Sequence, residues 1–197
     1  MPSDATRTRM RAVWNVSDSK SNTVYLGINS HRLEFSEMIK ILFVCHGNIC
    51  RSPMAEFVMK DLVYKAGLSA RFQIDSAATS REEIGNPIYP PARRKLAEHG
   101  VKVEDRAARQ LTRQDYEAYD FLIGMDQKNL RNMRSICGED DAGKMSLLMD
   151  YTKRPGDVAD PWYTRDFEAT WLDIAEGCQG LLEAWKTTIK FGKNKNI

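Results

Sequence analysis

The sequence predicts an α/β fold built on a doubly wound parallel sheet, because buried strands and amphipathic helices alternate along it. The run IKILFV at 39–44 is apolar apart from Lys40, which is typical of a strand buried on both faces of a parallel sheet. Apolar residues at helical spacing follow over 55–66 and again from Phe167 onward. Such alternation places helices on both faces of one sheet and ligand sites at the carboxyl ends of its strands.

The elements can be placed in order along the chain. The first strand is followed by a loop and then by a helix that ends at Gly67. Glu56 and Lys60 form an i,i+4 pair on the face of this helix opposite its apolar stripe. Further strands are expected at 71–77, 120–125 and 144–149, and further helices at 91–99, 127–136 and from Phe167 into the C-terminal region.

Residues 1–37 do not join this pattern, since they are polar and mixed apart from one strand-like run, NTVYLGI at 22–28. We expect an N-terminal extension of unknown role over 1–37 and a single domain over 38–197. A start codon placed too early would explain the segment as well, and an arm that binds a partner or regulates the protein is the alternative.

Composition excludes several classes of protein. The 197 residues carry 29 Lys and Arg against 27 Asp and Glu, which argues against a role in coating nucleic acid. No apolar run approaches the roughly 20 residues of a membrane span, and no signal peptide is indicated. We therefore expect a cytoplasmic protein with no nucleic-acid or membrane partner.

The cysteines indicate reactive chemistry. Four are present, and Cys45 and Cys50 lie only five positions apart. This spacing is that of neither a secreted disulfide framework nor a zinc site. At least one of the two is better explained as a reactive thiol.

The loop after the first strand has the composition of an anion site. Cys45 ends the strand, Gly47 lets the backbone turn, and Arg51 with Ser52 opens the helix. Successive backbone N–H groups can then converge at a helix N-terminus, where the unpaired amides and the helix dipole both favour negative charge. No lysine precedes Ser52 and no glycine triplet is present, so the loop is not a nucleotide-binding loop.

The same loop would activate a thiol. A thiol above such a nest has its pKa lowered from about 8.5 towards roughly 4 to 7. Ser52 can donate a hydrogen bond to that sulfur, and the planar guanidinium of Arg51 matches two oxygens of a phosphate. A strand-end cysteine can also be no more than a small buried hydrophobe, but the surrounding strand, turn and helix favour a phosphate-type site.

A thiolate that accepts a phosphoryl group also needs a proton donor for the leaving oxygen. The best candidate is Asp160, in VADPWYTRDF at 158–167, again at the carboxyl edge of the sheet. An Asp-Pro turn leading into a helix is the alternative. Trp162 and Tyr163 favour the acid, because exposed aromatic side chains can form walls for a flat substrate ring.

VCHGNICRSP at 44–53 and DPWY at 160–163 resemble the low molecular weight protein tyrosine phosphatases, and the likeness runs from about Met38 to the last helix. The resemblance implies a single α/β domain with a four-stranded parallel sheet. It also implies hydrolysis of phosphotyrosine in proteins or peptides through a phosphocysteine, without a metal or other cofactor. We expect a monomer or weak dimer.

The resemblance also implies roles for individual residues. Cys45 would be the nucleophile, Arg51 the phosphate clamp, and Asp160 the general acid and then base. Ser76 would support the loop, in which Asn48 and Ser52 tune the thiolate. The expected substrate-binding residues are His46, Gly47, Asn48, Ile49, Cys50, Ser52, Trp162 and Tyr163. Cys50 could also form a reversible disulfide with Cys45 that protects against over-oxidation.

Two positions depart from the family's pattern. Before ARQLT at 108–112 the family usually has a histidine that supports the loop asparagine, whereas this chain has Arg106. The support of Asn48 is therefore an open question. On the substrate rim the chain has SREEIG at 80–85, where some relatives carry an aromatic residue.

Other proteins resemble the same loop. Arsenate reductases need a further cysteine pair near the end of the third strand, where this chain has FLIGMD at 121–126. Protein arginine phosphatases have a threonine at the position of Ile49. A phosphopeptide-binding module without turnover is a third alternative, although binding alone would require neither Cys45 nor Asp160.

Overall fold

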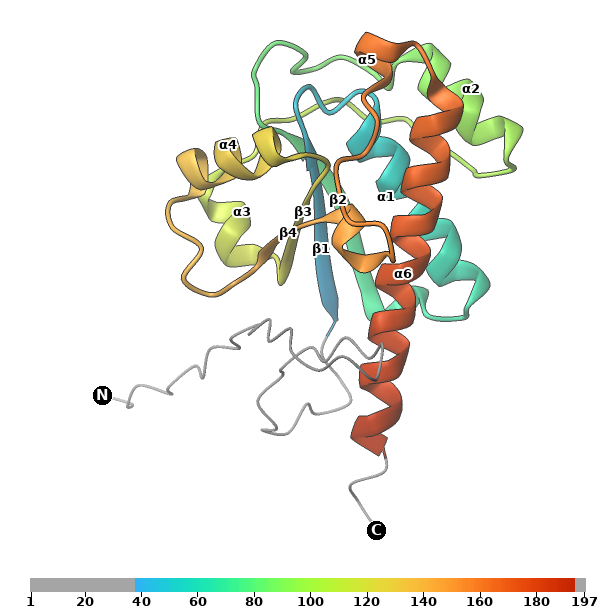
Figure 1. Ribbon diagram of the computed structural model, residues 1–197, viewed down its shortest axis with the longest axis vertical. Helices are drawn as coiled ribbons and strands as arrows, with labels where there is room; N and C mark the ends of the chain where they lie inside the picture. Colours follow the sequence, from blue (N-terminus) through green and yellow to red (C-terminus); the bar gives the residue numbers. More distant parts are fainter. Residues whose placement is uncertain (1–37, 194–197) are drawn as a thin grey trace.

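Four parallel strands form one sheet (Figure 1). The computed structural model describes residues 38–193, so the expected extension over 1–37 and its strand-like run at 22–28 lie outside the described residues. The strands are β1 (Ile39–Cys45), β2 (Phe72–Ala78), β3 (Phe121–Gly124) and β4 (Met145–Leu147). Their order is β2-β1-β3-β4 with every pair parallel, which confirms the predicted doubly wound, four-stranded fold.

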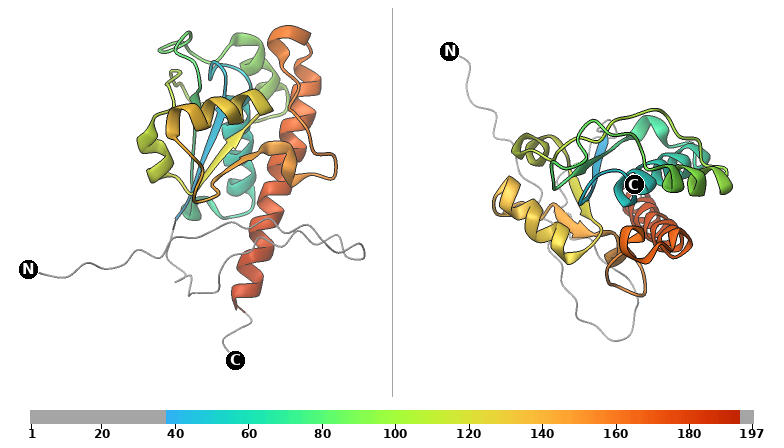
Figure 2. Two further views of the ribbon diagram at one scale, coloured as in Figure 1. Left: turned by 60° about the vertical axis from the view of Figure 1, so that its left-hand side comes forward. Right: turned by 90° about the horizontal axis from the view of Figure 1, so that it is seen from above.

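Helices cover both faces of the sheet (Figures 1 and 2). One face carries α1 (Arg51–Lys65), α2 (Pro90–Glu98) and α6 (Phe167–Lys193), and the other carries α3 (Arg113–Ala118) and α4 (Gln127–Cys137). The shorter elements are the 3-10 turns η1 (Ser69–Arg71) and η2 (Leu148–Tyr151) and the helix α5 (Pro161–Thr164).

Strand β1 divides the core into two parts. Ile41 and Phe43 pack with α1 and α6, whereas Leu42 and Val44 pack with α3 and α4, and all four side chains are fully buried. Because alternate residues of a strand point to opposite faces, a central strand with both faces covered is apolar where it is covered, here from Ile41 to Cys45. Its last residue, Cys45, therefore lies in the middle of the carboxyl edge of the sheet.

Helix α1 differs from its predicted orientation. Lys60 does pair with Glu56, at 2.6 Å between Nζ and Oε1, but Glu56 is 4% exposed. The expectation that this residue lies on an outward face was wrong. Residues 51–59 of α1 are all buried, because this half of the helix is covered on every side and a single apolar stripe does not describe it.

Helix α3 was not predicted, although its start carries a recognisable signal. Thr112 accepts a hydrogen bond from the backbone N–H of Asp115, and the Asp115 carboxylate accepts from the N–H of Thr112. This reciprocal arrangement is a capping box, in which each side chain satisfies an otherwise unpaired backbone donor. The helix has six residues, too few to produce a clear apolar period in the sequence.

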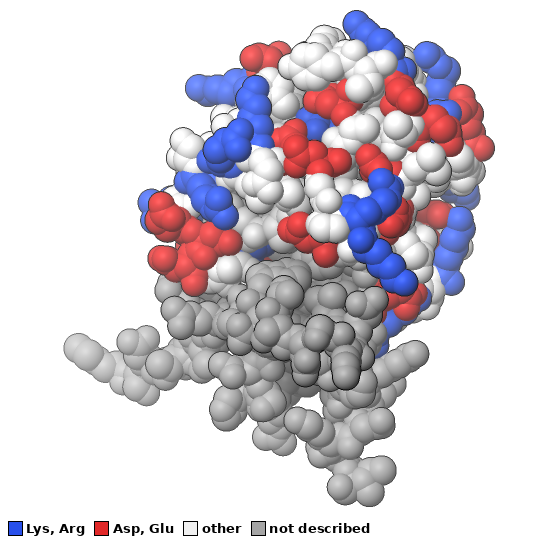
Figure 3. All heavy atoms as spheres, in the orientation of Figure 1, with Lys and Arg blue, Asp and Glu red and all other residues white. Residues whose placement is uncertain are grey.

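The surface has no strong field of one sign on the face in Figure 3, where basic and acidic side chains are interspersed. Within the described part of the chain, no helix is long and apolar enough to cross a membrane.

Candidate active site

A cavity of about 220 Å³ opens at the carboxyl edge of the sheet, between the ends of β1 and β3. The strand order changes direction here, since β2 lies on one side of β1 and β3 on the other, and ligand sites of open α/β sheets form at such points. The cavity is lined by Cys45, His46, Gly47, Ile49, Cys50, Arg51, Glu82, Glu83, Asp126, Lys128, Asn129, Asp160, Trp162 and Tyr163.

The loop between β1 and α1 wraps around the sulfur of Cys45. Asn48 has a left-handed backbone, with φ of 58°, and its N–H donates to Cys45 Sγ at 3.3 Å. Ser52 Oγ lies 3.1 Å from the same sulfur. Asparagine adopts this conformation more readily than most residues, so Asn48 suits the turn that aims the backbone at Cys45.

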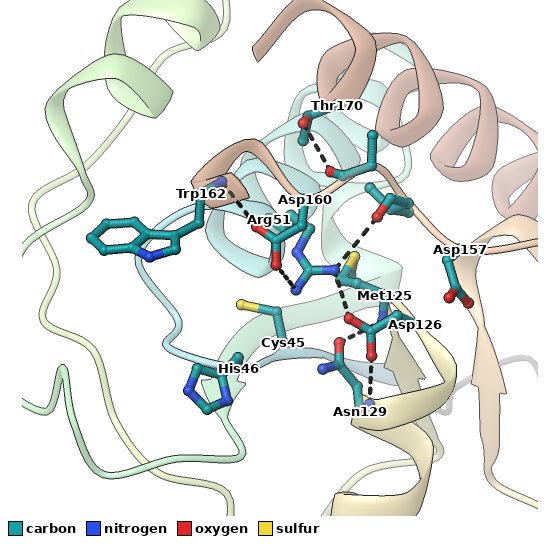
Figure 4. Close-up of polar contacts among 12 residues, drawn as sticks. Cys45, His46, Arg51, Met125, Asp126, Asn129, Asp157, Asp160, Trp162 and Thr170 are labelled. Carbon is teal, nitrogen blue, oxygen red and sulfur yellow. Dashed lines mark hydrogen bonds and ion pairs between the residues drawn. The ribbon is translucent and has the colours of Figure 1, made fainter. Parts of the chain in front are cut away.

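Arg51, the first residue of α1, lies beside this thiol (Figure 4). Its Nη1 donates to Asp126 Oδ2 at 2.7 Å and its Nη2 donates to Asp160 Oδ2 at 2.6 Å. Burial would lower the pKa of Arg51, but attraction to Cys45, Asp160 and Asp126 outweighs burial and raises it. The guanidinium is thus a fixed positive charge with a fixed orientation.

Asp126 is a site residue that the sequence analysis did not identify. Its Oδ1 accepts from the N–H of Asn129 and caps α4, while its Oδ2 accepts from Arg51. The signal was available, because an acidic residue directly after a buried strand lies at the carboxyl edge of the sheet. In FLIGMD at 121–126 the lack of cysteine was the feature used, and the acidic residue at its end was not.

Asp160 lies on the opposite side of the guanidinium from Asp126. Its Oδ1 accepts from the N–H of Trp162 and so caps α5. Trp162 and Tyr163 are 48% and 80% exposed, and the ring of Tyr89 meets Trp162 edge-on, with 5.8 Å between centroids. The structure brings the predicted acid and both predicted aromatic residues to the cavity. Tyr89, which was not predicted, packs against Trp162.

The rim of the cavity carries charge. His46 Nε2 lies 3.1 Å from Glu82 Oε2, and Lys128 also lines the cavity. Glu83 lies against the loop, since a Cβ at Gly47 would be 3.1 Å from its Cγ. The SREEIG segment at 80–85 therefore forms an acidic part of the rim.

The side chains of three predicted residues lie buried beneath the loop between β1 and α1. Asn48 and Ser52 are fully buried and Ser76 is 2% exposed, and none of them lines the cavity. Asn48 Nδ2 donates to both hydroxyls, at 2.8 Å each. These side chains can hold the loop but do not contact the space in which a substrate would lie.

The profile of the low molecular weight phosphotyrosine protein phosphatase family matches residues 40–191. The chain belongs to this family. It is also 40% identical over 147 residues to YfkJ, a low molecular weight protein-tyrosine-phosphatase of Bacillus subtilis, a match that covers 74% of this chain and 94% of YfkJ.

Several solved structures are similar to this chain over most of its length. The crystal structure of Bacillus subtilis YfkJ superposes with a TM-score of 0.76 over 78% of this chain and 98% of that one, at 38% identity. A low molecular weight protein tyrosine phosphatase from Streptococcus pyogenes superposes with a TM-score of 0.67 over 74% of this chain and 92% of that one, at 41% identity. DARP, a Drosophila arginine phosphatase, superposes with a TM-score of 0.68 over 75% of this chain and 98% of that one, at 32% identity.

The departure from the family at Arg106 has a structural answer. Its Nη2 donates to Asn48 Oδ1 at 2.6 Å and its Nη1 donates to the Asn48 carbonyl at 3.2 Å. The expected histidine is therefore replaced by a residue that contacts the same asparagine twice.

The remaining cysteines are all free thiols, as is Cys45. Burial, followed by repulsion from Cys45 and Asp160, raises the pKa of Cys50 to about 12. The 45–50 disulfide stays a prediction. Cys137 is the last residue of α4 and Cys178 lies within α6, so neither lies at the end of β3, and both are buried in the core. Within residues 38–193, no three His, Cys, Asp or Glu side chains group as candidate metal ligands.

Proposed function

We propose that the chain hydrolyses phosphotyrosine and other aryl phosphate monoesters through a phosphocysteine. The observation that carries this proposal is the geometry of Arg51, whose guanidinium is fixed by Asp126 and Asp160 beside the Cys45 thiol. A nucleophile, an anion clamp and a carboxyl group in one cavity are the three parts that the reaction requires.

In the first step Cys45 attacks as the thiolate, forming an S–P bond while the bond from phosphorus to the phenolic oxygen breaks. Arg51 and the backbone amides of the loop balance the charge on the phosphoryl oxygens. Asp160 exchanges its bond with Arg51 for one with the leaving oxygen and gives that oxygen a proton.

In the second step a water molecule attacks the phosphocysteine. Asp160, now a carboxylate, takes the proton of this water, the S–P bond breaks, and inorganic phosphate leaves with Cys45 restored as the thiolate. Turnover therefore begins with Cys45 as the thiolate and Asp160 as the acid, so kcat/KM should have a bell-shaped pH dependence.

Ile49 supports an aryl substrate over phosphoarginine. Its side chain lines the cavity and is 9% exposed, so it offers apolar surface to a phenyl ring and no hydrogen bond to a guanidinium. Trp162 and Tyr163 would form further walls for the ring. We assign this activity to residues 38–197, with a phosphotyrosine-containing protein or peptide as substrate.

The test is a panel of phosphotyrosine peptide, phosphoarginine and arsenate assayed on one preparation. We expect hydrolysis of phosphotyrosine only, and Cys45→Ser should abolish it while partly retaining the binding of phosphate or vanadate. Preferential turnover of phosphoarginine would favour the arginine phosphatase alternative, and thiol-dependent reduction of arsenate would favour the reductase. Binding with no turnover of any of the three would favour a phosphopeptide-binding module.

A further inference from the structure

The residue before the proposed acid is held by two side chains of α6. The N–H of Ala159 donates to Asp173 Oδ2 at 3.0 Å. Thr170 Oγ1 donates to the Ala159 carbonyl at 2.9 Å (Figure 4). Both backbone polar groups of Ala159 are therefore bonded to the same helix, one residue before Asp160.

Thr170 and Asp173 lie three positions apart, which places both side chains on one face of α6. Thr170 is fully buried, and its hydroxyl has a single hydrogen to give. A threonine inside a helix can give that hydrogen to the carbonyl four residues earlier, and the Asp166 carbonyl does lie 3.1 Å from Thr170 Oγ1. The Ala159 carbonyl is closer, so the hydroxyl also bonds to the segment that carries the acid.

Arg154 holds the carboxylate of Asp173 in place. Its Nη2 donates to Asp173 Oδ1 at 2.8 Å, and its Nε donates to Glu176 Oε2 at 2.6 Å. Asp173 thus uses one oxygen for Arg154 and the other for Ala159. Glu176 lies one turn further along α6 and bonds to the same arginine.

The position of Asp160 depends on the residues before it, because the helix after it is short. Helix α5 has only four residues. On the sheet side, the N–H of the buried Val158 donates to the carbonyl of Met125, directly after β3, at 2.8 Å. The backbone is therefore attached to the sheet edge through Val158 and to α6 through Ala159, and Asp160 follows at once.

We propose that Thr170 and Asp173 are positioning residues that hold Ala159 so that the carboxyl group of Asp160 can reach the leaving oxygen. In the proposed reaction Asp160 releases Arg51 and turns toward that oxygen, which requires its backbone to stay in place. A displacement of about 1 Å can cost roughly 10²-fold in rate. The inference rests on the proposed function, and it gives a role to two side chains that lie outside the cavity.

The decisive variant is Thr170→Val, which keeps the shape of the side chain and removes the hydrogen given to Ala159. We expect kcat/KM for phosphotyrosine to fall roughly 10-fold, because this constant includes the step in which the leaving oxygen takes a proton. For an aryl phosphate with an acidic phenol, which leaves without that proton, kcat/KM should stay nearly unchanged. Inhibition by vanadate should also stay unchanged, since Cys45 and Arg51 keep their contacts.

A merely structural role for Thr170 would lower kcat/KM for both substrates by the same factor. That result, or no fall for either substrate, would overturn the proposal. Thr170→Ser keeps the hydroxyl and should restore most of the lost activity on phosphotyrosine. A serine variant as impaired as the valine variant would show that the hydrogen bond to Ala159 is not what matters.

Asp173→Ala and Glu176→Ala form a matched pair. Each removes a carboxylate that bonds to Arg154, but only Asp173 accepts from the N–H of Ala159. We expect Asp173→Ala to lower kcat/KM selectively for phosphotyrosine, as Thr170→Val does, and Glu176→Ala to leave it unchanged. Equal effects of the two substitutions would mean that the link to Arg154, and not the hold on Ala159, is responsible.

A double-mutant cycle tests whether the effect passes through Asp160. In an Asp160→Asn background the proton donor is already lost, so Thr170→Val should cause no further fall in kcat/KM for phosphotyrosine. Losses that multiply in the double variant would contradict a role in positioning the acid.

Amide hydrogen exchange over residues 157–164 tests the same hold without a substrate. Exchange in this segment should be faster in Thr170→Val and in Asp173→Ala than in the unmodified protein, and unchanged in Glu176→Ala. Unchanged exchange in all three variants would overturn the proposal. If the unmodified protein hydrolysed neither substrate, the proposed function would fail while this readout remained intact.

Discussion

The two terminal nitrogens of Arg51 donate to two different carboxylates, those of Asp126 and Asp160, and each carboxylate also caps a helix. Asp126 also caps α4, whereas Asp160 also caps the four-residue helix α5. A phosphate that binds Arg51 must share the guanidinium with both. We expect Asp126, on α4, to keep its bond with Arg51. We expect Asp160, at the start of α5, to release Arg51 and to contact the leaving oxygen instead.

Asp160→Asn tests the role of the acid. The amide cannot supply a proton, so kcat should fall roughly 10² to 10⁴-fold on phosphotyrosine, whose leaving group needs protonation. For an aryl phosphate with an acidic phenol as leaving group, kcat should fall much less, and this substrate provides the control within the same protein. Full activity of this variant on phosphotyrosine would refute the assignment of Asp160.

Asp126→Asn separates the ion pair from the helix cap. Asparagine keeps an oxygen that can accept from the N–H of Asn129, as Asp126 does at 2.6 Å, but it loses its charge beside Arg51. We expect the inhibition constant for vanadate to rise about tenfold and the free energy of unfolding to change by less than about 1 kcal/mol. A large loss of stability with unchanged vanadate inhibition would show that Asp126 is mainly a cap.

The meeting of Cys45 with Arg51 and Ser52 in the candidate site could be predicted from the sequence because it is local. Cys45, Arg51 and Ser52 lie within one strand–loop–helix unit, and their meeting point follows from chain geometry. The contacts of Asp126 and Arg106 with the loop were harder to predict. Asp126 lies near the loop because β3 is next to β1 in the sheet, and Arg106 lies in a long irregular segment. The contact of Arg106 with Asn48 depends on the conformation of the arginine side chain, which the spacing of residues in the sequence does not define.

At the scale of elements, η2 packs closely on α6 because glycines of α6 face it. A Cβ at Gly180 would meet the carbonyl oxygen of Tyr151, and one at Gly177 would meet the side chain of Leu148. The strand predicted over 144–149 ends at Leu147 because the chain turns there into this contact. The hydrophobic run could not reveal the turn, since Leu148 and Met149 are buried as well.

Gly180→Ala should therefore destabilise the protein. The clash is with backbone that cannot move aside, so we expect a loss of roughly 1 to 3 kcal/mol in the free energy of unfolding, despite the gain of up to about 1 kcal/mol in helix propensity. Gly156→Ala is the control, because nothing lies within 4 Å of its added Cβ. Urea unfolding of both variants would decide, and equal midpoints would contradict the packing argument.

For the whole molecule, the two halves of the core each contain a buried thiol whose ionisation opposes folding. Burial alone raises the pKa of Cys178, and burial is also the largest cause of the rise to about 11 in Cys137. An unfolded thiol loses its proton near pH 8.5, so above that pH the native state binds more protons than the unfolded state. The free energy of unfolding must then fall as the pH rises, by up to about 1.4 kcal/mol per pH unit for each such thiol.

Cys178→Ala tests this dependence. We expect the variant to be less stable at pH 7 by roughly 1 to 2 kcal/mol, but its free energy of unfolding should fall less steeply between pH 8.5 and about 10.5. Urea titrations across this range in the presence of a reductant would measure both slopes. Parallel slopes would mean that Cys178 ionises in the native state as readily as in the unfolded chain.

The overall architecture followed from the alternation of strands and helices, but the burial of individual faces did not. Glu56 was expected on an outward face because helical periodicity assumes one exposed side, whereas α1 is enclosed between the sheet and its neighbouring helices over its first half. The cytoplasmic location, the oligomeric state and the extension over 1–37 stay predictions.

The proposed nucleophile and the proposed acid lie on segments that differ in how firmly the fold holds them. Cys45 ends a strand whose last five residues are buried, whereas Asp160 caps a four-residue helix that is followed by a left-handed Arg165 at φ of 61°. Short exposed segments open locally at a lower free energy than core strands. On gentle warming, proton delivery should therefore fail before phosphate is released from the loop, and turnover of phosphotyrosine should decline at temperatures where vanadate still binds.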